Sequence, residues 1–340
     1  MLNVTVGVVP ETTPAVFNKR FMEKVMADNK NKTEKKTFRL SSRNKRTLWC
    51  YAILSTQIIG LVVFVLYPTL WAWGKAFYYD VDVPSQLRFV GLDNFKRIFT
   101  TDRTYWQSWW TTFIFTIGKM PFELPIAMLL AVCLTRKSIK AKGFFRAIYY
   151  LPAVISSAII GLIMSSMFDY FGVVNKWLID LGILEKPLNW FGDTGSAMAM
   201  LVIMSTWASF GTNVLYFMGA LNNVPTDVIE SATIDGATPW QIFINVKLPI
   251  MAPVLQTVIL LALNGTLHTG EFILATTNGA PYGSTYTVMA YQVGKYVKGF
   301  GASQVVDLGY GAAVCVLTSI FMMIIAFGYN KLTKKLQNIY

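Results

Sequence analysis

Residues 221–252 read LNNVPTDVIESATIDGATPWQIFINVKLPIMA, and the pattern in this stretch predicts two short helices. Thr226 is expected to cap the first helix, and acidic residues follow in its first turn, where they complement the helix dipole. Gly236 suits the left-handed position that ends a helix. The segment Thr238-Pro239-Trp240-Gln241 then has the pattern of a capping box with proline at the first helical position. Pro249 is expected to end the second helix.

Long apolar stretches flank this segment on both sides. The chain of 340 residues is 54% hydrophobic and only 14% charged, whereas soluble proteins have about 25% charged residues. About 20 apolar residues are needed to cross a bilayer as a helix. The stretches of that length are 48–73, 108–134, 146–169, 196–220, 253–275 and 306–330. The sequence therefore predicts an all-α polytopic membrane protein with six transmembrane helices. Because 47 mostly polar residues precede the first stretch and no cleavage site follows it, we expect that stretch to remain as a span.

The positions of the basic residues predict the orientation in the membrane. The net charge is +12, and eleven Lys or Arg residues lie in residues 1–47. If the N-terminus is cytoplasmic, the segments inside hold 20 basic residues and the segments outside (74–107, 170–195 and 276–305) hold nine. Basic residues concentrate on the cytoplasmic side of membrane proteins, so we expect both termini to be cytoplasmic. No groove-reading motif accompanies the charge, so we expect membrane lipid and no nucleic acid as its partner.

The segment 221–252 departs from that bias, because it contains one basic residue, Lys247, beside three acidic residues. It also carries apolar side chains such as Trp240 and Phe243, which are expected to be exposed on a cytoplasmic loop. Such a surface is typical of a docking site for another protein. This segment is therefore the first place where we look for function.

The sequence lacks the residues that most kinds of catalysis need. Its three cysteines lie in apolar stretches, and His268 is the only histidine. These counts argue against a disulfide framework, a histidine metal centre and a Ser/His/acid triad. A phosphate-binding GxxxxGK[ST] loop is absent from the sequence as well. We therefore expect no enzyme activity, no catalytic residues, no cofactor and no metal.

The segment 221–252 resembles the EAA loop of type I ABC importer permeases. The matching residues are Glu230-Ser231-Ala232, Gly236 and Val246-Lys247-Leu248-Pro249, with Ser231 in place of alanine and Val246 in place of isoleucine. In that family the loop is the coupling helix, which inserts into a cleft of the nucleotide-binding subunit. The resemblance assigns this role to Glu230, Ala232, Asp235, Gly236, Ala237, Leu248 and Pro249.

Further motifs extend the resemblance over residues 50–330 and favour the carbohydrate (maltose and multiple-sugar) branch of the family. They are Phe89-Val90-Gly91-Leu92-Asp93-Asn94-Phe95, the segment 145–152 (FRAIYYLP), Gly172-Val173-Val174-Asn175 and the segment 277–285 (TNGAPYGST). The resemblance implies a type I permease fold with a core over 105–330. Residues 48–104 then form the first helix and the outer loop. Residues 1–47 form a basic cytoplasmic extension, and residues 331–340 form a cytoplasmic tail.

The resemblance also implies a function and a set of partners. The chain is expected to be the permease subunit of an ATP-driven sugar or oligosaccharide importer in a bacterial cell membrane. The expected partners are a second permease subunit, two ABC nucleotide-binding subunits that hydrolyse the ATP, an extracytoplasmic solute-binding protein and the carbohydrate substrate. Two alternatives remain: the same role for another solute, such as a glycerol phosphodiester or a peptide, and a secondary transporter that works alone.

Polar residues inside the expected spans are candidates for the substrate path, because such residues are costly in lipid. Lys119 and Glu123 lie four residues apart beside two prolines, and they form either an intrahelical ion pair at a bend or a polar lining for sugar hydroxyls. His268 and Glu271 are expected to share one helix face in the fifth span. The predicted substrate path consists of Asn213, Tyr216, Asn264, His268, Glu271 and Glu123. Ordinary hydrogen bonding between helices is the alternative interpretation of these residues.

Overall fold

The computed structural model describes residues 22–24, 26, 42–81, 87–136, 139, 141–297 and 306–337. Most of the predicted extension 1–47 therefore lies outside the described residues. The chain divides into two compact units, Met1–Pro68 and Thr69–Tyr340.

In the first unit, the described residues from Ser42 onward form the greater part of one long apolar helix. Helix α2 (Ser42–Leu61) continues through a π-helical turn, η1 (Val62–Leu66), into α3 (Tyr67–Lys75). Residues Trp49–Lys75 are long and apolar enough to cross a membrane, which agrees with the predicted span 48–73. No residue of η1 or α3 is buried. Side chains this apolar need a lipid or protein environment to remove them from water.

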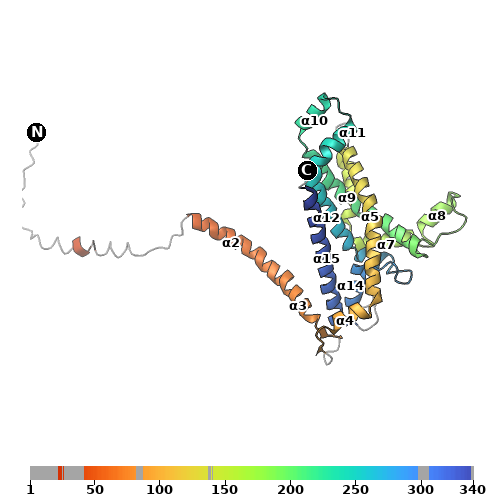
Figure 1. Ribbon diagram of the computed structural model, residues 1–340, viewed down its shortest axis with the longest axis horizontal. Helices are drawn as coiled ribbons and strands as arrows, with labels where there is room; N and C mark the ends of the chain where they lie inside the picture. The colour runs from red at the N-terminus through yellow and green to blue at the C-terminus, as the bar shows by residue number, and fades with distance from the viewer. Residues whose placement is uncertain are drawn as a thin grey trace, which may run out of the picture. The chain divides into compact units, whose positions relative to one another are not determined.

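The second unit is a helical bundle (Figure 1). Its strands β1 (Tyr78–Tyr79) and β2 (Arg88–Phe89) form a small antiparallel pair with Tyr78 opposite Phe89. Its helices are α4 (Asp93–Thr100), α5 (Arg103–Thr135), α6 (Lys142–Val154), α7 (Ser157–Met167), α8 (Val173–Asp180), α9 (Thr194–Asn222), α10 (Thr226–Ile234), α11 (Pro239–Ile242), the π-helical η3 (Phe243–Lys247), α12 (Leu248–Leu267), α13 (Glu271–Thr276), α14 (Val288–Tyr296) and α15 (Leu308–Gln337). Helices α10 and α11 lie at one end of the bundle, near the end of α15, and α4 lies at the other end (Figure 1).

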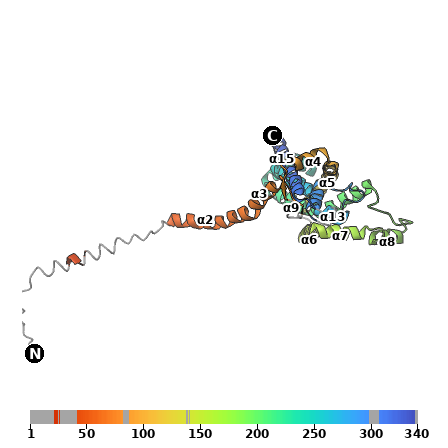
Figure 2. The ribbon, with the colours of Figure 1, turned by 90° about the horizontal axis from the view of Figure 1, so that it is seen from below.

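The predicted number of spans holds if one bent pair of helices counts as a single span. Helices α5 and α9 contain the expected spans 108–134 and 196–220, and α15 begins two residues after the start of the expected span 306–330. The expected third span, 146–169, is not one straight helix. Helices α6 and α7 meet at a bend of 94°, and both lie along one side of the unit (Figure 2). The helix is interrupted because Ile155 and Ser156 adopt extended ψ angles of 142° and 134°.

Close packing explains why α7 turns away from the direction of α6. Helix α7 packs against α13, and a Cβ atom added at Gly161 would lie 2.9 Å from the Cβ of Ala275. A glycine at this position lets the two helices approach until their backbones nearly touch. The contact with α13, which comes more than a hundred residues later in the chain, therefore fixes the direction of α7.

The fifth span differs from the expected 253–275 at both ends. The apolar helix runs from Pro239 to Leu267, so the second short helix of the loop and the span form one helix. The prediction that Pro249 ends a helix is wrong. The preceding turn, η3, is a π-helix. In a regular α-helix the proline ring would clash with the carbonyl group of the residue four positions earlier, and the wider π-helical turn makes room for the ring of Pro249. At the other end the helix stops at Leu267, and α13 begins separately at Glu271.

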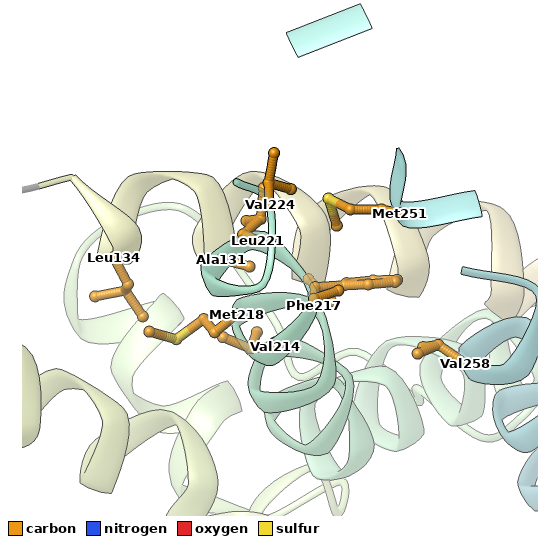
Figure 3. Packing of buried hydrophobic residues seen from close by; sticks show 11 residues of the cluster. Ala131, Leu134, Val214, Phe217, Met218, Leu221, Val224, Met251 and Val258 are labelled. Atoms are coloured by element: carbon orange, nitrogen blue, oxygen red, sulfur yellow. The ribbon is translucent and has the colours of Figure 1, made fainter. Parts of the chain in front are cut away.

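The core of the bundle at the α10 end joins three of the long helices (Figure 3). Ala131 and Leu134 of α5 pack with Val214, Phe217, Met218 and Leu221 of α9 and with Met251 and Val258 of α12. Val224, which precedes α10, belongs to the same cluster. Burial of these side chains stabilises the contact by roughly 1.5–3 kcal/mol for each large apolar residue in an aqueous reference. The loop is thereby fastened to the spans.

Two motif asparagines bind backbone groups of segments outside the long helices. The Asn94 side chain is buried, and its Nδ2 donates to the carbonyl oxygens of Ala76 and Tyr78 at 2.9 Å each. The Asn175 Nδ2 donates to the carbonyl oxygen of Leu188 at 2.8 Å, and its Oδ1 accepts from the Leu188 amide at 3.2 Å. Both asparagines thus satisfy backbone groups that strands or helices would satisfy elsewhere.

The close contact between α6 and α9 predicts that one methyl group added at Gly211 lowers the stability of the protein. A Cβ added at Gly211 of α9 would lie 2.0 Å from the carbonyl oxygen of Tyr149, whereas a Cβ added at Gly219 on the same helix meets nothing within 4 Å. We expect Gly211→Ala to lower the melting temperature of the purified protein, because α6 must move away. Gly219→Ala is the matched control and should be neutral or stabilising, since alanine favours helix by about 1 kcal/mol over glycine. Equal melting temperatures for the two variants would show that α6 does not pack here.

Candidate functional site

A cavity of about 410 Å³ lies between α5, α6, α7, α9, α12 and α13. Its lining is formed by Lys119, Glu123, Pro152, Ala153, Ile155, Ser157, Ile160, Ser205, Ala208, Ser209, Thr212, Asn213, Tyr216, Leu261, Ala262, Gly265, Thr266, Thr269 and Phe272. The polar members of this set are mostly hydroxyl-bearing side chains, and the aromatic members are Tyr216 and Phe272. A concave surface with a few polar groups among apolar ones is the usual form of a small-molecule site.

A charged network occupies the α5–α9 side of the cavity. The Lys119 Nζ lies 3.5 Å from the Glu123 Oε2, and both side chains are at most 5% exposed. The other carboxylate oxygen, Oε1, accepts hydrogen bonds from the Ser209 Oγ at 2.6 Å and from the Asn213 Nδ2 at 2.9 Å. The ion pair within one helix, one of the two alternatives for these residues, is present, and α9 supplies two further donors to the carboxylate. The Glu123 carboxylate therefore links α5 to α9 and is also the ion-pair partner of Lys119.

The hydroxyl groups around this network are mostly bonded to their own helices. The Thr266 Oγ1 donates to the carbonyl oxygen of Ala262 at 2.8 Å, and the Thr269 Oγ1 donates to that of Gly265 at 3.1 Å. Each hydroxyl oxygen still has lone pairs that can accept a further hydrogen bond. The cavity therefore offers mainly acceptors on the α12 side and a carboxylate and an ammonium group on the α5 side.

The structure separates the predicted path residues into two groups. Glu123, Asn213 and Tyr216 line the cavity. Asn264, His268 and Glu271 are exposed and do not belong to its lining. Glu271 contacts the lining, because its Oε2 accepts a hydrogen bond from Ser157 at 3.4 Å, and Ser157 lines the cavity.

The expected shared face of His268 and Glu271 does not form. His268 is the residue that ends α12, and its Nδ1 lies 2.8 Å from the carbonyl oxygen of Asn264. Glu271 is the first residue of the next helix, after a break at Gly270. A Cβ at Gly270 would lie 2.9 Å from the Cβ of Met289, so close packing against α14 sets this break. No pattern within 253–275 could have indicated that contact.

Ser209 is a cavity residue that the sequence analysis missed. Its hydroxyl donates to Glu123 from a position 86 residues away in the chain. The available signal was weak: Ser205, Ser209 and Asn213 recur every four residues along α9 and so share one face. That polar stripe in an apolar helix indicates a buried partner, although it does not identify the partner as Glu123.

The α10–α11 segment has the turn that the sequence predicts. Gly236 has a φ of +81°, its amide donates to the Thr233 carbonyl, and the Ala237 amide donates to that of Ala232. This pair of bonds is a Schellman motif, which satisfies the carbonyl groups at the end of a helix. The capping box of Thr238 and Gln241, with Pro239 following the cap, is also present.

One capping prediction in this segment is wrong. The residue before the first turn of α10 is Pro225, and no side chain caps the helix there. Thr226 lies one residue inside the helix, and its hydroxyl donates to the Asp227 carboxylate at 3.3 Å. The buried Val224 holds the chain in the core at this point. The helix therefore begins immediately after the anchored residue.

The same segment exposes large apolar side chains at the end of the bundle. Ile234 is 85% exposed and Trp240 is 68% exposed, and the Trp240 and Phe243 rings stack at 6.0 Å. Among the residues to which the resemblance assigns a coupling role, Glu230, Asp235, Gly236 and Pro249 are exposed, and Ala232, Ala237 and Leu248 are partly buried. A rigid helical turn with exposed apolar residues is suited to bind a second protein.

The opposite end of the bundle has a cluster of charged and aromatic residues around Asp102. The Asp102 Oδ1 caps α5 by accepting from the Tyr105 amide at 3.0 Å, and its Oδ2 accepts from the hydroxyls of Tyr291 and Tyr310. Burial, and then the adjacent carboxylate, raises the pKa of Tyr291, so this hydroxyl remains a donor. Burial lowers the pKa of Lys295. The cluster joins α14 to the beginning of α5.

Within the described part of the chain, no three His, Cys, Asp or Glu side chains gather in a way that would hold a metal ion. The site is instead defined by the hydrogen-bonding cavity and by the exposed segment at the end of the bundle. Both features are fastened to the same helices, α9 and α12.

Known proteins are similar to this chain in sequence, and solved structures are similar to it in fold. It is 30% identical to the probable ABC transporter permease protein YesP of Bacillus subtilis over 80% of this chain and 86% of the relative. It is 27% identical to the arabinooligosaccharides transport system permease protein AraP of the same organism, over 83% and 88%. Its fold matches a chain of a bacterial alginate ABC transporter, solved in complex with a periplasmic protein that binds an alginate pentasaccharide, with a TM-score of 0.71 at 22% identity. That match covers 88% of this chain and 98% of the other.

A bundle of membrane-spanning helices with a polar cavity inside it and an exposed helical turn at one end defines a multi-pass transport permease. Residues 123–337 match the family of binding-protein-dependent transport system inner membrane components, and the chain belongs to this family. It is a permease subunit of an ABC transporter, with the type I importer permease fold that the sequence predicts.

The network around Glu123 predicts a large loss of stability when the carboxylate is removed. Glu123→Ala leaves Lys119 buried without its counter-charge and removes the acceptor for Ser209 and Asn213. We expect a loss of about 3–5 kcal/mol, the range for breaking one partner of a buried ion pair, measured as a lower melting temperature by circular dichroism. Glu185→Ala makes the same chemical change at an exposed position and should leave the melting temperature unchanged. An unchanged melting temperature for Glu123→Ala would show that the network does not stabilise the bundle.

Proposed function

We propose that this permease imports oligosaccharides and that the α10–α11 turn couples it to a separate ATPase. The observation that carries the proposal is the mechanical link between the two features. Val224 and Met251, which flank the turn, are buried in the same core as α9, and α9 carries the polar face of the cavity. A force applied at the exposed turn therefore reaches the cavity through closely packed side chains.

The composition of the cavity supports a carbohydrate as the substrate. Hydroxyl-rich ligands need many hydrogen-bonding partners and an apolar surface for the faces of their rings. The cavity supplies both kinds of group, namely the network around Glu123 and the rings of Tyr216 and Phe272. The name of the relative AraP specifies arabinooligosaccharides, which agrees with this substrate class.

The proposed assembly contains a second permease subunit, two nucleotide-binding subunits and an extracytoplasmic solute-binding protein. The family name supports the binding protein. Both termini and the α10–α11 turn are proposed to be cytoplasmic, because the basic residues concentrate on that side. The end with α4 and the Asp102 cluster then faces outward, where a binding protein delivers its ligand.

We expect substitution of Gly236 to detach the ATPase. A β-branched residue is strained at a φ of +81°, so Gly236→Val should distort the turn and reduce co-purification of the nucleotide-binding subunit at least tenfold. Gly182→Val is the matched control, because Gly182 also has a positive φ, +71°, and open space around its Cβ position. Gly182 follows α8 and lies far from the turn in the chain.

Glu230→Arg tests the same surface without altering the backbone, with Glu185→Arg as its control. Both glutamates are exposed, so neither substitution disturbs the core. We expect only the Glu230 variant to lose the ATPase, while both variants reach the membrane in normal amounts. Retention of the ATPase by both the Gly236 and the Glu230 variants would rule out coupling through this turn.

Calorimetry on the cognate solute-binding protein tests the substrate class. We expect it to bind an oligosaccharide, with arabinotriose, maltotriose and lactose as the first ligands to titrate. If the binding protein binds a glycerol phosphodiester or a peptide instead, the permease imports that solute and not an oligosaccharide. Uptake by the permease without any ATPase would point to a secondary transporter.

A further inference from the structure

A second cavity, of about 360 Å³, lies at the end of the bundle that contains α4 (Figure 1). Residues of α4, α14 and α15 and the beginning of α5 line this cavity. Its charged side chains are two cations, Arg97 and Lys295, and one carboxylate, Asp102. The cationic side chains therefore outnumber the carboxylates in the lining.

The Asp102 carboxylate already has hydrogen-bond donors on both oxygens. Its Oδ1 accepts from the Tyr105 amide at 3.0 Å, and its Oδ2 accepts from the hydroxyls of Tyr291 and Tyr310. These three bonds join α5, α14 and α15. Asp102 thus holds three helices together, and it is not within ion-pair distance of either cation.

The Lys295 ammonium group has no ion-pair partner among the described residues. Its Nζ lies over the rings of Tyr291 and Tyr310, at 4.7 Å and 5.9 Å from their centroids. A ring face attracts a cation but offers no lone pairs to its three N–H donors. Burial lowers the pKa of Lys295, Asp102 raises it, and Arg97 lowers it again. The positive charge is therefore only partly compensated.

Arg97 is also weakly paired. Its guanidinium carbon lies 4.4 Å from the centroid of the Tyr310 ring, and its Nη1 is 3.9 Å from the Asp307 Oδ2. A charge-assisted hydrogen bond is about 2.7–2.9 Å long, so the contact with Asp307 is not one. Because Arg97 and Lys295 both lie over Tyr310 and line the same cavity, one ligand can reach the donors of both.

The cavity lies where two helices enter the membrane. The membrane-crossing stretches of α5 and α15 begin at Arg103 and Leu308, and the lining residues Asp102, Thr104 and Tyr310 are within two positions of these starts. The 33 residues of α5 extend about 50 Å at 1.5 Å per residue. A hydrocarbon core is about 30 Å thick. The first turn of α5 therefore lies beyond the hydrocarbon, at the depth of the lipid headgroups.

Aromatic side chains mark the same depth. Phe99 of α4 and Trp106 of α5 are exposed, with ring centroids 5.6 Å apart, and Trp106 also packs against Phe321 of α15. Tryptophan is enriched where a membrane protein meets the headgroups. The surface formed by α4 and the first turns of α5 is therefore suited to contact lipid.

We propose that this cavity binds the phosphate group of an anionic phospholipid in the leaflet at the α4 end of the bundle. The Lys295 ammonium and the Arg97 guanidinium donate to the phosphate oxygens, and a guanidinium can bind two such oxygens at once. Phosphate is the anion that every phospholipid carries at this depth. The inference goes beyond the proposed function, because it does not depend on the solute that the permease carries.

The charges in the cavity favour an anionic lipid over a zwitterionic one. A phosphatidylglycerol headgroup adds one negative charge beside the two cations. A phosphatidylcholine headgroup adds a third cation as well, and the hydrogen bonds of Asp102 are already made within the protein. The depth of the cavity favours lipid over an acidic side chain of a protein that approaches from water.

A double variant removes both cations from the cavity. Arg97→Gln with Lys295→Met is compared with Arg103→Gln and Lys96→Met together, which make the same chemical changes and the same change in net charge. Arg103 and Lys96 are exposed on α5 and α4 and do not line the cavity. Melting temperatures recorded without added lipid separate weaker binding from loss of the fold.

The measurement is native mass spectrometry of the complete transporter, freed of lipid by detergent exchange and titrated with dioctanoyl phosphatidylglycerol. We expect the tightest site of the wild type to bind this lipid at least tenfold more tightly than dioctanoyl phosphatidylcholine. The cavity variant should bind phosphatidylglycerol at least tenfold more weakly than the wild type. The control variant should bind it as the wild type does.

Three results would overturn the inference. The first is equal affinity of the cavity variant and the control variant for phosphatidylglycerol. The second is displacement of the lipid by a hundredfold excess of inorganic phosphate, which would assign the cavity to the free anion. The third is displacement by the cognate solute-binding protein, which would make the cavity a protein docking site. If the cavity variant does not assemble, Lys295→Met alone carries the test: weaker binding supports the site, and unchanged affinity contradicts it.

Discussion

Packing of α9 against α5 and α12 is the contact on which the rest of the bundle depends. Phe217 and Val214 are almost fully buried in that contact (Figure 3), and the residues one and two turns earlier on α9 form the polar wall of the cavity. One helix therefore has an apolar end that fixes the loop and a polar middle that faces the cavity.

The charged network is the one costly feature of this packing. An isolated charge inside a membrane protein is unfavourable, so such groups are paired and line a cavity. Here the carboxylate of Glu123 takes two hydrogen bonds from α9 and an ion pair from its own helix. The network joins α5 to α9 and also presents polar groups to the cavity. The same residues therefore form bonds between helices and line the cavity.

Features set by local chemistry could be predicted from the sequence. The capping box at Thr238 and the left-handed turn at Gly236 depend on residues within a few positions of each other, and the long apolar helices follow from composition. The errors came from long-range contacts. The break after Leu267 is set by packing against α14, and the bend after Ile155 follows the contact of α7 with α13. Likewise, Ser209 and Glu123 are 86 residues apart, and no single-sequence pattern shows that they meet.

The helical stretch from Pro239 to Leu267 runs from the exposed turn to the lining of the cavity. At about 1.5 Å per residue, its 29 residues extend roughly 44 Å, which is more than the thickness of a hydrocarbon core of about 30 Å. Trp240 is at the outermost turn of this rod, and Gly265 and Thr266, which line the cavity, are near its far tip. One helix therefore connects the exposed indole with the lining of the cavity, by way of the π-helical turn η3 and Pro253.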